Sequence, residues 1–238
     1  MQHTAHSFRS TSWSDVVRAG GGASTDQRAA LESLLTVYWP PLYAFLRRDG
    51  HGAAEAEDLV QGFVLHVMES GTLARASEER GRFRSFLLGA LKRYVAQRHR
   101  HDTAQKRSPG TALLQIDAPA VEAALDAEGA GNADTAFERA WVSQVLRRAT
   151  ERVRQAYTQD GRGELFDVLS PFMTGQSGET IAGAAARQRM SEGAMGMALH
   201  RLRCRFGEAV REEVAALVAT PDEVDDEVRL LLAALGKK

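Results

Sequence analysis

The chain contains 238 residues, of which 44% are hydrophobic and 26% are charged, and its formal net charge is −1. This composition is typical of a globular protein, and the length suits two small domains joined by a linker. No apolar run approaches the roughly 20 residues that span a bilayer, residues 1–12 lack the apolar core of a secretory signal, and a lone cysteine, Cys204, excludes an intrachain disulfide. We therefore expect a cytoplasmic protein with no membrane partner.

The elements expected in the first half of the chain are all helices. Apolar residues recur at three- and four-residue spacing over 31–48, and Pro40-Pro41 is expected to kink that helix or divide it. A turn at 49–52 separates it from a helix over 53–70, and another helix follows over 82–101. No alternating strand pattern or hairpin signal accompanies them. The sequence therefore predicts an all-α fold.

The second half of the chain opens with a segment of different composition. Residues 108–133 are rich in Ala, Gly, Asp and Glu with few large apolar groups, which indicates a flexible acidic linker with one short helix around 121–127. Helical periodicity resumes at Phe137. Further helices are expected over 163–173, 179–187 and 192–217, and a last one opens with Thr220-Pro221, a capping residue followed by a first-turn proline.

The predicted architecture is two small helical domains, a linker and a helical extension. Its parts are a disordered N-terminus over 1–11, a first domain over 12–107, a linker over 108–136, a second domain over 137–211 and an acidic C-terminal extension over 212–238. The extension carries an apolar stripe that includes Val224 and Leu231 and must be buried against something. We expect it to pack on the second domain and to shield the arginines there.

The near-zero net charge hides a strong segregation of charge along the chain. Ten basic residues face three acidic ones over 75–107, and six arginines face two glutamates over 187–211. Acidic residues dominate the two intervening or following segments, 108–135 and 212–236. Two basic patches separated by acidic segments favour two contacts with nucleic acid over one diffuse coat.

The helix over 53–70 has two distinct faces when residues are placed 100° apart. Leu59, Val60, Phe63, Val64 and Val67 share the face expected in the core. A second face collects Asp58, Gln61, Leu65 and Glu69. Apolar side chains ringed by polar ones favour docking of a protein partner. A merely solvated helix face is the alternative.

The helix from residue 82 and the helix from residue 192 are the candidate DNA contacts. In the first, cations project opposite an apolar face, and the flanking aromatics could stack unpaired bases or simply serve the core. In the second, Ser191 is a good N-cap, and Met195, Leu199, Leu202 and Phe206 form the buried seam. The preceding turn makes this a helix-turn-helix whose arginines suit phosphates or guanine edges. A surface helix that contacts nothing is the alternative.

Taken together, three segments near the N-terminus and a long one after it resemble a known family. Tyr38-Trp39-Pro40-Pro41-Leu42-Tyr43, Glu57-Asp58-Leu59-Val60-Gln61 and Gly81-Arg82-Phe83-Arg84-Ser85-Phe86-Leu87 look like the first conserved domain of RNA polymerase sigma factors of the extracytoplasmic-function type. Residues 137–211 look like the second domain of the same family.

The resemblance implies a division of labour between these parts. Asp58 and Gln61 would grip the clamp helices of the largest polymerase subunit, and the basic helix would melt and hold the downstream promoter element. The second domain would read the upstream element. The chain departs from the family pattern at Gly62, where a bulkier, often acidic residue is usual. Other departures are Gly183-Ala184 in the first helix of the helix-turn-helix, Gln188-Arg189 in place of a leucine-glycine turn, and Gly196 in place of a basic residue.

The predicted function is that of a non-enzymatic sigma factor whose partners are core RNA polymerase and promoter DNA, with an anti-sigma factor as a further candidate. No catalytic motif, cofactor motif or paired metal-ligand motif is present, and His99 and His101 diverge on a helix. The alternatives are a sigma-derived regulator that no longer reads promoters and a free helix-turn-helix regulator. The candidate polymerase contacts are Glu57, Asp58, Gln61 and Leu65, and the candidate DNA contacts are Arg84, Lys92, Arg93, His99, Arg100, Arg187, Ser191, His200, Arg201, Arg203 and Arg205.

Overall fold

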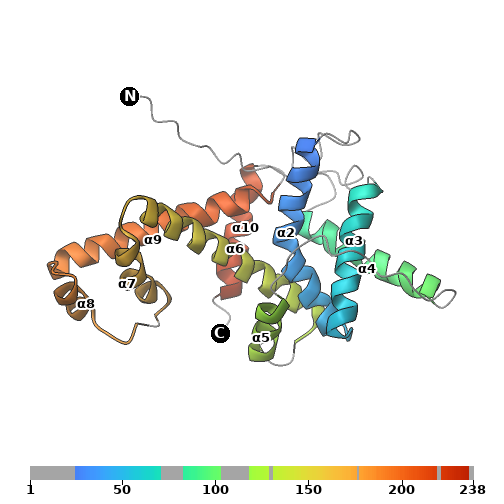
Figure 1. The fold of residues 1–238 in the computed structure, drawn as a ribbon, viewed down its shortest axis with the longest axis horizontal. Helices are drawn as coiled ribbons and strands as arrows, with labels where there is room; N and C mark the ends of the chain where they lie inside the picture. The colour runs from blue at the N-terminus through green and yellow to red at the C-terminus, as the bar shows by residue number, and fades with distance from the viewer. Residues whose placement is uncertain are drawn as a thin grey trace. The chain divides into compact units, whose positions relative to one another are not determined.

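The computed structural model describes residues 25–70, 83–102, 118–128, 131–175, 177–218 and 221–235 (Figure 1). All regular structure in these ranges is helical, as the sequence predicts. The helices, labelled as in Figure 1, are α2 (Thr25–Arg48), α3 (Ala53–Glu69), α4 (Phe83–Asp102), α5 (Ala118–Glu128), α6 (Ala133–Gln159), α7 (Gly163–Thr174), α8 (Ile181–Arg187), α9 (Glu192–Ala215) and α10 (Pro221–Leu235). Within the described ranges, no helix has the length and apolar character needed to cross a membrane. The expected disordered N-terminus over 1–11 lies outside the described residues.

The chain divides into two compact units. The first comprises residues 1–144 and 214–238, and the second comprises residues 145–213. The divisions fall inside α6 and α9, whereas the sequence places them at a linker over 108–136 and at residue 211. Part of the expected linker is folded: residues 118–128 form α5, which packs on α2.

Polar and apolar contacts both hold α5 on α2. Leu125 is buried with Ala44 of α2 and Ala136 of α6, and the Glu122 carboxylate accepts hydrogen bonds of 2.5 Å each from Tyr43 Oη and Arg47 Nε. Burial, reinforced by the bond to Glu122, raises the pKa of Tyr43 to about 12, so its hydroxyl stays a donor at neutral pH. These contacts join residues far apart in sequence, which local composition cannot reveal.

Helix α2 runs through Pro40-Pro41 without being divided. A proline inside a helix costs roughly 3 kcal/mol because it removes a hydrogen bond and crowds the preceding turn. Here Tyr38, Trp39 and Leu42 are almost completely buried around the prolines, and each large apolar side chain contributes about 1.5–3 kcal/mol on burial. Burial of this segment therefore outweighs the local cost.

A tight turn connects α2 to α3. Gly50 has φ +103°, in the left-handed region that favours glycine. The amide of Gly50 donates to the Arg47 carbonyl, and the amide of His51 donates to the Leu46 carbonyl at 3.1 Å. This is the Schellman pattern, which ends α2 and fixes the direction in which the backbone leaves it. His51 thereby takes a defined, buried position at the start of α3.

The C-terminal helix α10 belongs to the first unit, which also includes residues 137–144, the start of the second domain expected from the sequence. Its Val224 and Leu231 are buried as the apolar stripe predicts. Its Glu227, which is 2% exposed, lies 3.1 Å from the guanidinium of Arg84 on α4. The sequence shows that the apolar stripe of α10 must be buried. It does not show that Glu227, on the same helix, meets Arg84 of α4.

The second unit is built from the later part of α6, α7, α8 and most of α9. Its core includes Tyr157, Phe166, Leu169 and Leu202. Helix α7 ends at Gly175, whose φ of +70° gives a left-handed cap.

Candidate interaction surfaces

Helix α3 has the two faces that its sequence predicts. Leu59, Val60, Phe63, Val64 and Val67 are all buried. On the other side Asp58 is exposed, while Glu57, Gln61 and Leu65 are half-buried. Neither Asp58 nor Gln61 makes a hydrogen bond or ion pair with any described residue. The stripe of Glu57, Asp58, Gln61 and Leu65 is therefore available to a partner, and we call it the α3 stripe.

Gly62 on α3 has a packing reason that the sequence does not show. A Cβ atom at this position would lie 2.5 Å from Tyr94 Oη and 2.9 Å from Arg98 Nη1, both on α4. The two α4 side chains are joined by a 3.0 Å hydrogen bond from Arg98 to Tyr94. The bulkier residue expected at this position from the family resemblance would meet that pair, so Tyr94 and Arg98 would have to shift to admit it.

Arg84, expected to contact DNA, is buried and paired inside the first unit. It is 7% exposed, with its Nη1 atom 3.0 Å from Glu138 Oε2, and its guanidinium lies 4.6 Å from the centre of the Trp141 ring. As the structure stands Arg84 cannot reach a phosphate, which corrects the prediction for this residue. Sequence reasoning missed this because Glu138 and Glu227 belong to α6 and α10, far along the chain.

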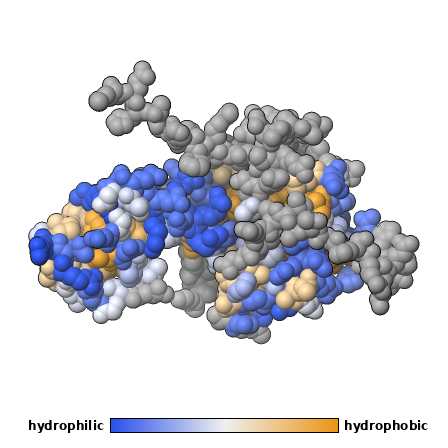
Figure 2. Space-filling view, in the orientation of Figure 1, coloured by the Kyte–Doolittle hydropathy of each residue, from blue (hydrophilic) through white to orange (hydrophobic). Residues whose placement is uncertain are grey.

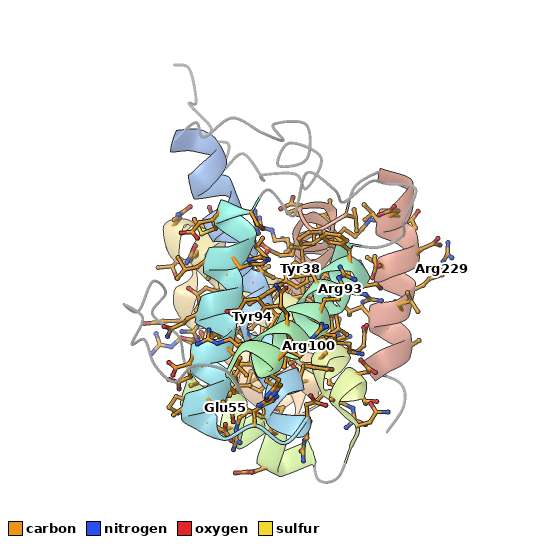
Figure 3. All side chains as sticks on the ribbon, turned by 90° about the vertical axis from the view of Figure 1, so that its right-hand side faces the viewer. Tyr38, Glu55, Arg93, Tyr94, Arg100 and Arg229 are labelled. Atoms are coloured by element: carbon orange, nitrogen blue, oxygen red, sulfur yellow. The ribbon has the colours of Figure 1, made fainter. Side chains whose placement is uncertain are left out.

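The other candidate residues on α4 reach the surface. Lys92 is exposed but pairs with Asp134 at 2.6 Å. Arg93, His99 and Arg100 are also exposed. Figure 3 labels Arg93 and Arg100, which are seven residues apart and so lie on one side of α4. The cationic surface of α4 therefore comprises Lys92, Arg93 and Arg100, with Arg84 turned inward. Of the flanking aromatics, Phe83 is buried and packs edge-on against Tyr38, so it serves the core.

Helices α8 and α9 are consecutive and joined by a short capped turn. The Thr180 side chain accepts a hydrogen bond from the Gly183 amide at 3.1 Å, and the Ser191 hydroxyl accepts one from the Ala194 amide at 3.2 Å. Ser191 is thus the N-cap that its sequence position predicts. Between the helices Arg189 has φ +54°, in the left-handed region. Glycine is usual at this position in the family that the chain resembles. It would avoid the roughly 1–2 kcal/mol that the left-handed conformation costs other residues.

The outward face of α9 contains the residues that its periodicity predicts. Met195, Leu199 and Leu202 are buried, whereas His200 and Arg201 are exposed and Met197 is 54% exposed. In the view of Figure 2, the surface of the second unit is mainly hydrophilic and contains smaller hydrophobic areas. Arg201 makes no ion pair or hydrogen bond with any described residue, so its charge is available to a phosphate.

Three other arginines of the second unit already have internal partners. Arg187 pairs with Glu179 at 2.6 Å, Arg205 pairs with Asp160 at 3.4 Å, and Arg203 donates to the Phe172 carbonyl at 3.3 Å. All three are exposed. Exposed pairs of this kind contribute only about 0–1 kcal/mol, so a phosphate can compete for these arginines, though at a higher cost than for Arg201.

A group of polar side chains that the sequence does not connect lies between the α2–α3 turn and the end of α4. His99 stacks on His51 with ring centres 5.6 Å apart, and His51 Nδ1 is 3.0 Å from Glu55 Oε1. The hydrogen bond from His51 lowers the pKa of Glu55, so Glu55 is a carboxylate at neutral pH. No local spacing in the sequence relates His99 to His51, so the sequence does not predict this cluster.

No protein-family model, no curated protein and no solved structure matches the chain. The function must therefore be argued from the residues and their geometry.

Proposed function

We propose that this chain is a sigma factor of the extracytoplasmic-function type, a cytoplasmic, non-enzymatic protein that directs core RNA polymerase to promoters. The observation that carries the proposal is the α3 stripe. Asp58 is exposed and unpaired with any described residue, and it stands beside half-buried Gln61 and Leu65. An apolar side chain beside exposed polar groups favours docking of a protein partner, and the rim of such an interface is polar. It also matches the segment on which the family resemblance rests.

Two cationic surfaces support a role in promoter binding. On α4, Lys92, Arg93 and Arg100 offer contacts to the phosphates of an opened strand. On the second unit, the consecutive helices α8 and α9 would serve as the helix-turn-helix, with His200 and Arg201 exposed on the second of them. Phosphate contacts position a protein, whereas side chains that reach base edges give specificity. The proposal assigns the first role to the arginines and the second to His200.

Reconstituted transcription tests this proposal. The purified chain is mixed with core RNA polymerase and templates that the mixture itself has selected from a random library. We expect run-off products with a defined start site that depend on the added chain, with core polymerase alone as the control. Failure of the chain to bind core polymerase would reject the proposal.

A second candidate is a sigma-derived regulator that binds polymerase but reads no promoter. The observation in its favour is that the exposed surface of α9 offers few side chains that could contact a base. Gly193 and Gly196 have nothing within 4 Å of the position where a Cβ would stand, so two outward positions offer no side chain to a base. The same experiment separates the two candidates, because this regulator would bind core polymerase without producing specific transcripts.

A further inference from the structure

We propose that His51, Glu55 and His99 form a zinc-binding site in the first unit. One donor atom from each of these three side chains lies within 4.8 Å of the other two. The donors come from three places: the turn after α2, the first turn of α3 and the end of α4. This inference is independent of the proposed function in transcription.

The separations suit a tetrahedral ion after a small adjustment. Zinc bonds of about 2.0–2.2 Å to nitrogen and oxygen place neighbouring ligand atoms roughly 3.4 Å apart. His51 Nδ1 and Glu55 Oε1 are already 3.0 Å apart. His99 is exposed but stacks on His51, so its ring must turn out of that stack to aim a nitrogen at the ion. In Figure 3, Glu55 lies toward the end of α4 that carries Arg100.

His51 is held in place before any ion arrives. Its side chain is 10% exposed, and Asp49 Oδ2 lies 3.9 Å from its Nε2 atom. At this distance the two groups are not hydrogen-bonded, but a small movement of the exposed Asp49 side chain would let its carboxylate accept from the outer nitrogen, which is the usual support of a histidine that binds a metal. The backbone is fixed as well: Arg47 donates to the His51 carbonyl at 2.6 Å, and Gly50 sets the turn.

The donor set selects the class of ion. Two imidazoles and one carboxylate favour zinc and similar late transition metals over magnesium and calcium, which prefer oxygen ligands. Three protein ligands leave a fourth position for water. A bound ion would tie the end of α4 to the start of α3.

Titration calorimetry of the full-length, tag-free chain with zinc chloride tests the site. A Cys204→Ser background is used, because Cys204 Sγ lies 3.7 Å from His200 Nε2 and offers a competing pair of donors. We expect saturable binding of one ion per chain. His99→Ala and Glu55→Gln change exposed side chains, and each should weaken binding at least about tenfold, since even the loss of a supporting residue typically costs 10–100-fold.

The matched control is His66→Ala, an exposed histidine on α3 outside the cluster. It should bind zinc like the parent, and zinc should raise the melting temperature of the parent and of His66→Ala but not that of His99→Ala. Absence of saturable binding, or parent-like binding by both His99→Ala and Glu55→Gln, would overturn the proposal.

Discussion

The guanidinium of Arg84 on α4 lies 3.1 Å from the carboxylate of Glu227 on α10, and both side chains are almost completely buried. The Glu138 carboxylate lies 3.0 Å from the same nitrogen, and the Trp141 ring lies beneath the cation. The Glu227 contact has the distance of an ion pair, but Glu227 Oε2 lacks a hydrogen bond of good geometry. A buried cation with two carboxylates thus joins α4, α6 and α10 inside the first unit.

Glu227→Ala should destabilise the first unit by about 3 kcal/mol, near the low end of the 3–5 kcal/mol that breaking a buried pair costs, because Glu138 still faces Arg84. Urea denaturation of the full chain measures the change. The control on the same helix is Arg229→Ala, whose exposed pair with Asp226 should matter by less than about 0.5 kcal/mol. Figure 3 shows Arg229 pointing away from the rest of the first unit. Equal effects of the two substitutions would contradict the assigned role of Glu227.

Glu213 should make the second unit sensitive to acid. Burial alone raises the pKa of this carboxyl, but hydrogen bonds from Arg148 and Arg152 outweigh burial and hold the pKa below its usual value. A folded pKa below the unfolded one gives stability that is present above the unfolded pKa, about 4.3, and is lost as pH falls through the folded value. Stability of the parent should therefore decline as pH falls below about 4.3 by more than that of Glu213→Gln. Parallel pH profiles of the two proteins would refute this.

Gly62→Ala should fail to give the stabilisation of roughly 1 kcal/mol that alanine normally brings to a helix interior. The added Cβ would meet Tyr94 Oη at 2.5 Å, so Tyr94 must shift. In a Tyr94→Phe background the nearest oxygen is gone, and Gly62→Ala should be more favourable there than in the parent. Chemical denaturation of the four proteins gives the coupling between the two positions. Additive effects would show that Tyr94 does not limit this site.

Asp58→Ala should weaken binding to core RNA polymerase at least tenfold, because losing a charged partner at an interface typically costs about 2–5 kcal/mol. Asp58 is exposed and unpaired with described residues, so helical circular dichroism should not change. Asp126→Ala removes an exposed acid of the same unit on α5 and serves as the control. A fluorescence titration with core enzyme that gives equal affinities for both variants and the parent would remove Asp58 from the docking surface.

Arg201→Ala should weaken promoter and non-promoter DNA by similar factors and reduce the salt slope of binding by about one. Arg154→Ala is the control, since its guanidinium already pairs with Asp167 in the same unit. His200→Ala is expected to relax sequence preference instead. His200 is exposed on α9, and its imidazole can form a hydrogen bond with a base edge. Binding to a selected promoter and to scrambled DNA is measured over a salt series. If Arg201→Ala abolished discrimination while sparing non-specific binding, Arg201 would be the base reader.

The sequence alone determined the helices and the faces they bury. The buried side of α3, from Leu59 to Val67, and the seam of Met195, Leu199 and Leu202 on α9 follow from a local period of 3.6 residues. The Ser191 cap follows from a hydroxyl one position before a helix. These features depend on residues within a few positions of one another, so a pattern in the chain is enough to predict them.

Only the tertiary structure decided which distant groups meet. Arg84 carries the same charge as Arg93, yet it is buried because Glu138 and Glu227 arrive from α6 and α10. The continuous α2 through Pro40-Pro41 depends on burial of the aromatic side chains around it. His99 meets His51 and Glu55 only because α4 packs beside the start of α3. Burial and charge pairing depend on how distant helices pack together. Local spacing therefore cannot predict that Arg84 is buried while Arg93 is exposed.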